Sequence, residues 1–205
     1  MTERADTAAR SVSNTTPALR PRSIALVAVF AALITVAAIV PGIPVGTLGV
    51  PITLQTLAVM LTGLCLGPLR GGLAVLLYLV VGFVGFPVFS KGQSGLGVLA
   101  GPSAGYLVAF VVAAVVVGFA ASRVVHRRPA TWAPLFFVSA MLTSIVVVHG
   151  LGILGMVVNA DLSLADAFKA DLVFYPGDVV KNLVAASAAA AVHRAFPDLL
   201  ARRPR

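Results

Sequence analysis

An acidic and a basic residue, Asp178 and Lys181, stand three positions apart at the start of an apolar segment that runs to Val192. Pro176 suits the first position of a helix, which places Asp178 in the first turn, where free N–H groups and the helix dipole favour a carboxylate. Lys181 then follows on the same helix face, about 4.5 Å farther along the axis. One face thus offers a group that only accepts hydrogen bonds and one that only donates them. A small molecule with both N–H groups and a carbonyl would suit this pair.

The alternative is an ion pair that neutralises itself and holds helices together. Lys181 is the only ionisable side chain between residues 179 and 192. A charge that faced lipid there would cost several kcal/mol, so the ammonium must face protein, water or a ligand. Ionisable residues within a membrane segment are functional by default, and a binding site is therefore the preferred interpretation.

The composition predicts an all-α integral membrane protein. Of the 205 residues, 59% are hydrophobic and 11% are charged, which is too apolar for a soluble domain. Because one span needs about 20 residues, the chain has room for roughly six helices and little else. We expect a disordered tail at 1–22, a membrane domain at 23–195 and a basic tail at 196–205. The six transmembrane helices are predicted at 23–40, 52–66, 72–85, 104–125, 132–158 and 176–195.

Two features lie between the predicted spans. The loop at 86–103, between the third and fourth helices, is rich in glycine and can present backbone N–H groups to a ligand, as lids often do. Residues 161–174 predict a short amphipathic helix, which Ser163 and Asp166 begin in the manner of a capping box. Gln55, near the start of the second helix, is either a ligand contact or a hydrogen bond between helices, with the latter slightly favoured.

The distribution of Lys and Arg predicts that both termini are cytoplasmic. Only Lys91 and Lys169 lie on the opposite side, so the glycine-rich loop and the start of the last helix share the external side and form a pocket open to the outside. The twelve residues on the cytoplasmic side are Arg4, Arg10, Arg20, Arg22, Arg70, Arg123, Arg127, Arg128, Arg194, Arg202, Arg203 and Arg205.

Several classes of function are disfavoured. The net charge of +8 comes from arginines that flank apolar segments, so it indicates membrane anchoring and not nucleic-acid binding. Cys65 is the only cysteine and can form neither an internal disulfide nor a thiolate metal cluster. We expect no metal or cofactor, and we interpret His149 as a hydrogen-bonded core residue. No phosphate-binding loop motif occurs, so the chain cannot hydrolyse ATP by that device.

The sequence resembles the BioY family, the biotin-specific substrate-binding subunits (S components) of energy-coupling-factor (ECF) transporters. The resemblance covers about residues 23–194, and its most specific part is the Pro-Gly-Asp sequence at 176–178 with Lys181. Its other motifs are VPITLQT at 50–56, FPVFS at 86–90, GLG at 95–97, and Gly101-Pro102 with Gly105-Tyr106.

The resemblance implies a biotin pocket. Asp178 would accept hydrogen bonds from the N–H groups of the cyclic urea, while Lys181 would donate to its carbonyl. The apolar ring would pack on Tyr175 or Phe89. The carboxylate would find residues of the glycine-rich loop, and the wall would include two residues on helices. These further candidates are Lys91, Gln93, Gly95, Gly97, Tyr106 and Gln55.

It also implies partners in the cell membrane, namely a transmembrane coupling protein (T component) and two ATPase subunits. Ala28 and Ala32 form a small-xxx-small pair that would let a partner helix approach closely. One alternative is a stand-alone secondary carrier with Asp178 as its proton site. Another is an intramembrane serine protease, in which Ser94 of a Gly-Gln-Ser-Gly sequence would use His149 as its base.

Overall fold

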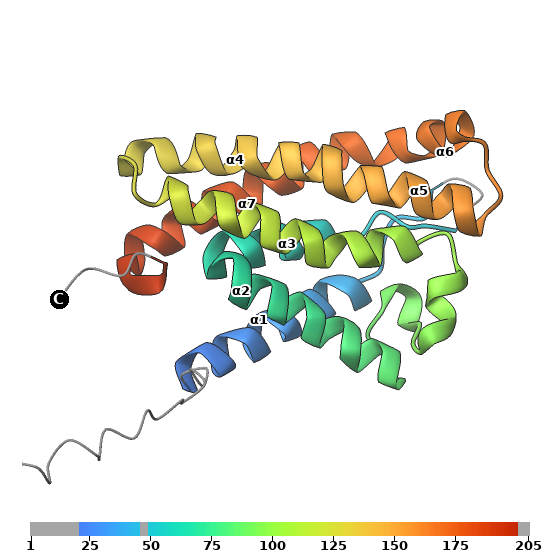
Figure 1. Ribbon diagram of the computed structural model, residues 1–205, viewed down its shortest axis with the longest axis horizontal. Coiled ribbons are helices and arrows are strands. Elements are labelled where there is room, and N and C mark those ends of the chain that lie inside the picture. Colours follow the sequence, from blue (N-terminus) through green and yellow to red (C-terminus); the bar gives the residue numbers. More distant parts are fainter. Residues whose placement is uncertain (1–20, 46–48, 201–205) are drawn as a thin grey trace, which may run out of the picture.

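The computed structural model describes residues 21–45 and 49–200, and it is a helical bundle (Figure 1). The predicted tail at 1–22 lies outside this range except for its last two residues, which begin the first helix. The helices are α1 (Pro21–Ile39), α2 (Gln55–Val84), α3 (Ala104–Val124), α4 (Trp132–Thr143), α5 (Gly150–Asn159), α6 (Leu164–Asp171) and α7 (Tyr175–Ala195).

The outer faces of these helices are apolar. Large hydrophobic side chains such as Val29, Val108, Val146 and Leu183 are exposed on four different helices, as expected for a bundle whose solvent is lipid. Within the described residues, four helical segments are long and apolar enough to cross a membrane: Pro21–Ile39, Gln55–Val84, Ala104–Val124 and Pro129–Asn159. The prediction of an all-helical membrane protein is confirmed.

Helix α2 doubles back at Gly67. Gly67 has φ 77°, a left-handed conformation that glycine adopts without strain, and Pro68 follows it. A Cβ on Gly71 would lie only 3.0 Å from the Cα of Gly63, although a straight helix would separate those two residues by about 12 Å. The two arms therefore correspond to the separate helices predicted at 52–66 and 72–85.

The predicted helix at 132–158 is interrupted in its middle. Between α4 and α5 the chain forms a π-helical segment, η4 (Ser144–His149). The segment contains no proline or other breaker that would have revealed it in the sequence. The capped start of α6 is confirmed, because the Ser163 hydroxyl accepts a hydrogen bond from the backbone N–H of Asp166 at 3.1 Å.

The two ends of the bundle differ. The start of α1, the α3–α4 turn and the end of α7 lie together on the left of Figure 1, and the loops before and after α2 lie at the other end. The second loop contains two short 3₁₀ segments, η1 (Ser90–Gly92) and η2 (Leu96–Ala100). The start of α7 also lies toward this loop end, so the bundle brings together the segments that carry the predicted site.

Helices α3 and α5 cross at two glycines, Gly105 and Gly155. A Cβ on Gly105 would clash with the backbone oxygen of Leu151 and would lie 2.9 Å from the Cα of Gly155. We expect Gly105→Ala to lower the thermal unfolding temperature of the detergent-solubilised protein, because forced overpacking costs about 1–3 kcal/mol. Gly150→Ala is the matched control, since a Cβ there meets nothing within 4 Å. Equal unfolding temperatures for the two variants would contradict this account of the crossing.

Candidate functional site

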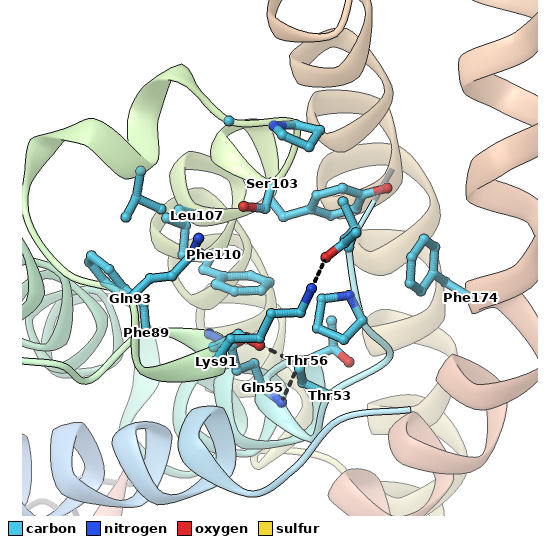
Figure 2. Close-up of a pocket in the computed structure, with 18 of the residues that line it drawn as sticks. Thr53, Gln55, Thr56, Phe89, Lys91, Gln93, Ser103, Leu107, Phe110 and Phe174 are labelled. Atoms are coloured by element: carbon cyan, nitrogen blue, oxygen red, sulfur yellow. Dashed lines mark hydrogen bonds between the residues drawn. The ribbon is translucent and has the colours of Figure 1, made fainter. Parts of the chain in front are cut away.

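A cavity of about 530 Å³ lies between the loop end of the bundle and the start of α7. Figure 2 shows it enclosed by the two loops around α2, by side chains of α3, and by Phe174 from the short 3₁₀ segment η5 (Leu172–Phe174) before α7. Apolar walls come from Leu107, Phe110, Val148 and Phe174. Its volume falls in the range of small-molecule sites, which are mostly apolar with a few placed polar groups. The cavity therefore suits a compact solute with polar ends.

Asp178 and Lys181 form the polar wall that α7 contributes. The Lys181 ammonium lies 2.8 Å from Asp178 Oδ1, and the exposed fractions of the two side chains are only 11% and 3%. Thr56, from the first arm of α2, completes the wall. Its hydroxyl donates to Asp178 Oδ1 at 3.1 Å and accepts from Lys181 Nζ at 3.1 Å. All three residues line the cavity.

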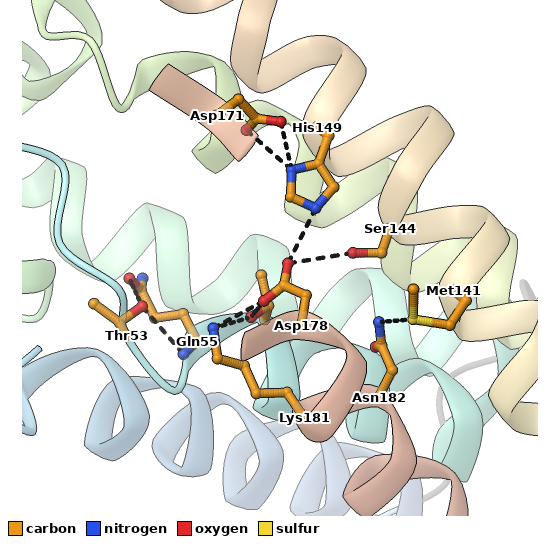
Figure 3. A network of polar contacts seen from close by, with 10 residues as sticks. Thr53, Gln55, Met141, Ser144, His149, Asp171, Asp178, Lys181 and Asn182 are labelled. Carbon is orange, nitrogen blue, oxygen red and sulfur yellow. Dashed lines mark hydrogen bonds and ion pairs between the residues drawn. The ribbon is translucent and has the colours of Figure 1, made fainter. Parts of the chain in front are cut away.

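The opposite oxygen of Asp178 faces η4 (Figure 3). Asp178 Oδ2 lies 3.2 Å from His149 Nε2 and 3.4 Å from the Ser144 hydroxyl. Five residues along an α-helix point in directions about 140° apart, so Ser144 and His149 would not share one face of such a helix. A π-helix closes its hydrogen bonds between residues i and i+5, and this segment brings both side chains to the same carboxylate.

Asp178 is thus surrounded by four protein donors. A ligand N–H group must replace one of them, and Thr56 is the most replaceable, because its hydroxyl lies on the cavity side and can rotate. The Lys181 ammonium has three N–H groups, of which the described contacts use two. The third remains for a carbonyl oxygen in the cavity. The wall can therefore offer a ligand one acceptor, one donor and one adaptable hydroxyl.

A second polar cluster lies behind Asp178. Asp171, the last residue of α6, is completely buried and accepts a hydrogen bond from the Tyr106 hydroxyl at 2.6 Å. His149 Nδ1 lies 2.9 Å from the same carboxylate, and the imidazole stacks on the Tyr175 ring at 4.2 Å between centroids. The imidazole therefore bridges two buried carboxylates, one from α6 and one from α7.

Only some of the loop residues that were predicted to contact a ligand line the cavity. Lys91, Gln93, Gly97 and Phe89 line it. The Lys91 ammonium donates to the carbonyl of Gly49 at 2.6 Å and so joins the two loops (Figure 2).

Tyr175 and Gly95 are not among the lining residues. Tyr175 stacks on His149 instead, so its predicted role against a ligand ring gains no support from this arrangement. Phe89 lines the cavity and packs edge-on against Tyr78, with ring centroids 5.5 Å apart.

Two other predicted residues line the cavity while bonded to protein. Gln55 donates to the Tyr78 hydroxyl at 2.8 Å, which joins the two arms of α2, as the interhelical interpretation expected. Tyr106 is committed to Asp171. Ala28 and Ala32 do not line the cavity, and both are exposed on α1.

Four residues around the Asp178 carboxylate and its neighbours were not among the predicted contacts: Thr56, Ser144, His149 and Asp171. Thr56 lies within one of the motifs quoted above, but its role depends on the contact between the first arm of α2 and α7. Asp171 has no local signal, because its burial follows from the docking of α6. His149 was expected to be a core histidine. It is buried, but it also lines the cavity and faces Asp178.

Apolar outer faces, several membrane-length helices and an enclosed polar wall define a multi-pass membrane protein that holds a small solute. Residues 9–198 match the BioY family, and this chain belongs to that family.

The chain is similar to proteins named as biotin transporters and to a solved crystal structure. A biotin transporter BioY of Rhizobium etli is 40% identical over 183 residues, which cover 88% of this chain and 98% of that protein. A biotin transporter BioY of Rhodobacter capsulatus is 41% identical over 191 residues, covering 89% and 98%. The crystal structure of a biotin S component from an ECF-type ABC transporter superposes with a TM-score of 0.79 at 26% identity, covering 84% of this chain and 91% of that one.

Proposed function

We propose that this chain binds biotin in the cavity and acts in biotin uptake as the substrate-binding subunit of an ECF-type ABC transporter in the cell membrane. The observation that carries the proposal is the polar wall of Asp178, Lys181 and Thr56 in a cavity of about 530 Å³. A cyclic urea has two N–H donors and one carbonyl acceptor, which is the complement of this wall. The named relatives and the S-component fold support the same solute.

The rest of the molecule would fit into the rest of the cavity. The thioether-containing ring would pack on Phe89 and Phe110, and the carboxylate would lie toward Lys91 and Gln93 in the loop. Lys91 would then exchange the Gly49 carbonyl for the ligand carboxylate, which is the stronger, charge-assisted partner. Recognition would thus use both ends of the solute.

Isothermal titration calorimetry of the purified chain in lipid nanodiscs tests this function. Biotin and desthiobiotin, which both keep the urea and the carboxylate, should bind. A biotin derivative methylated on both urea nitrogens should not, because Asp178 would then face no N–H group. The chain alone should show no ATPase activity, and concentrative uptake should require a T component and two ATPase subunits. Absence of biotin binding by folded protein would refute the proposal.

The protease alternative is disfavoured by the position of His149. Both ring nitrogens lie within hydrogen-bonding distance of carboxylates, at 2.9 and 3.2 Å. Neither is free to activate Ser94, as a catalytic pair requires. We therefore propose that the chain is not an enzyme.

We also propose six transmembrane helices with both termini in the cytoplasm. The return of α2 at Gly67 supplies two spans in place of one, the segment Pro129–Asn159 supplies another, and α7 would be the last. The cavity would then open to the outside.

This orientation is tested by Gly97→Cys in a background in which the native Cys65 is replaced by Ala. Gly97 is exposed and lines the cavity. A membrane-impermeant maleimide added to intact cells should label the new cysteine, and biotin should protect it. A cysteine at Ser122 on the opposite end should be labelled only after lysis. The reverse pattern would invert the topology.

A further inference from the structure

The two ring nitrogens of His149 each face a buried carboxylate, and this arrangement determines the protonation state of the imidazole. Asp171 lies at 2.9 Å from Nδ1 and Asp178 at 3.2 Å from Nε2. An ionised carboxylate only accepts hydrogen bonds, and a neutral imidazole has a single N–H group. With a neutral ring, one nitrogen lone pair would therefore point at a carboxylate lone pair, with no water to separate them, because His149 is only 2% exposed.

The charges of the site lead to the same requirement. Lys181 carries one positive charge, whereas Asp171 and Asp178 carry two negative charges between them. A neutral His149 would leave one uncompensated negative charge among side chains that are 3% exposed or less, and a buried unpaired charge is costly. One added proton makes the cluster neutral. A neutral site suits an uncharged urea group.

We propose that His149 is held as an imidazolium between Asp171 and Asp178, and that it is the positioning residue that fixes the Asp178 carboxylate for ligand binding. The binding half of this inference rests on the proposed function, whereas the protonation half does not. His149 touches the carboxylate oxygen that points away from Lys181. Lys181 and Thr56 hold only the other oxygen, Oδ1. His149 at 3.2 Å, with the longer contact of Ser144 at 3.4 Å, therefore restrains the rotation of the carboxylate.

The surroundings of the ring favour this placement of the proton. Asp171 from α6 also accepts from the Tyr106 hydroxyl of α3, which stabilises the carboxylate as an anion. The Tyr175 ring of α7 lies nearly parallel to the imidazole, with 19° between the planes, and an aromatic face attracts a cation. These three residues, with Asp178, are the titratable groups that face His149 in the described structure. Since imidazole is more basic than a carboxylate, the shared proton belongs on His149.

Nitrogen-15 NMR of the histidine-labelled full chain in nanodiscs tests the protonation. The protein has three histidines, and ordinary histidines are neutral at pH 8. We expect one imidazole, absent from His149→Gln, to keep both ring nitrogens protonated at pH 8. Should His149→Gln not fold, the wild-type spectrum still decides, because a doubly protonated ring at this pH is either present or absent. Three neutral imidazoles at pH 8 would overturn the inference, including the case in which Asp171 carries the proton.

Calorimetric biotin titrations across the pH at which this signal disappears test the positioning role. The affinity of the wild type should fall at least about tenfold as His149 loses its proton, while the biotin carboxyl group stays ionised throughout. In Asp171→Asn the amide can donate to Nδ1 of a neutral ring whose Nε2–H still faces Asp178. In that variant the pH dependence of the biotin affinity should be abolished.

The NMR spectra and the biotin titrations together distinguish a failure of this inference from a failure of the proposed function. A doubly protonated His149 with an affinity that does not change as the proton is lost would overturn the positioning role and leave the proposed function intact. A pH dependence that persists unchanged in Asp171→Asn would also overturn it, because the dependence would then arise elsewhere. Absence of biotin binding at every pH would instead refute the proposed function, and the NMR result would still decide the protonation state.

Discussion

Asp178→Asn is expected to weaken biotin binding by about ten- to a hundredfold. The substitution keeps the shape of the side chain but replaces one acceptor oxygen by a donor. An unpaired buried polar group costs about 1–3 kcal/mol, and 1.4 kcal/mol is a factor of ten in affinity. Either orientation of the amide directs its NH₂ group at a donor, toward the Lys181 ammonium or toward the His149 ring. Calorimetry in nanodiscs measures the effect.

Asp166→Asn is the matched control for this variant. Asp166 lies on the exposed surface of α6, and its pKa is held below the usual range by the Ser163 hydroxyl and by Lys169. It is therefore ionised at neutral pH, so the control removes one negative charge without touching the cavity. Biotin affinity should be unchanged. A comparable loss of affinity in both variants would point to a general electrostatic effect.

Combining Lys181→Met with Asp178→Asn distinguishes a ligand site from a purely structural ion pair. Each single change at Asp178 or Lys181 leaves a buried charge without its partner, which destabilises the fold. The double variant Asp178→Asn/Lys181→Met removes one charge of each sign and leaves the Asp171 carboxylate and His149 to balance each other. Stability should then largely recover, whereas biotin binding should stay lost. A well-folded double variant that binds biotin like wild type would exclude this pair from the site.

The sequence predicts the helices well because their signals are local. Apolar runs of membrane length, Pro41 after α1, and the Gly67-Pro68 break in α2 all act through neighbouring residues. Asp178 and Lys181 were also predictable, since an acid and a base in a membrane segment must face something other than lipid.

The remainder of the site depends on contacts between distant segments. Thr56 reaches Asp178 across 122 positions in the sequence, and Tyr106 reaches Asp171 across 65. The π-helical turn is equally invisible to pattern analysis, because the same apolar residues would suit an α-helix. Without that turn, the alignment of His149 with Asp178 could not be inferred, and a core histidine was the reasonable expectation.

The double variant Ala28→Leu/Ala32→Leu is expected to reduce biotin uptake at least about tenfold, while the affinity for biotin stays unchanged. The two alanines are exposed on α1, whereas Ala31, Ile34 and Ala38 face the core. Larger side chains there would prevent a partner helix from approaching closely, and a loss of 1.4 kcal/mol in docking is a factor of ten. The measurements are radiolabelled biotin uptake by cells that also express the T component and both ATPase subunits, and calorimetry of the isolated chain.

Ala191→Leu is the matched control, because Ala191 is also exposed but lies near the end of α7. It should leave both uptake and affinity unchanged. The separation of uptake from affinity is the decisive feature: the cavity is formed by the two loops, α2, α3, η4 and α7, and no residue of α1 lines it. A substitution on the outer face of α1 can therefore change transport only through an outside partner or through the lipid. If the double variant transports biotin as well as Ala191→Leu does, α1 is not the surface on which the coupling protein docks.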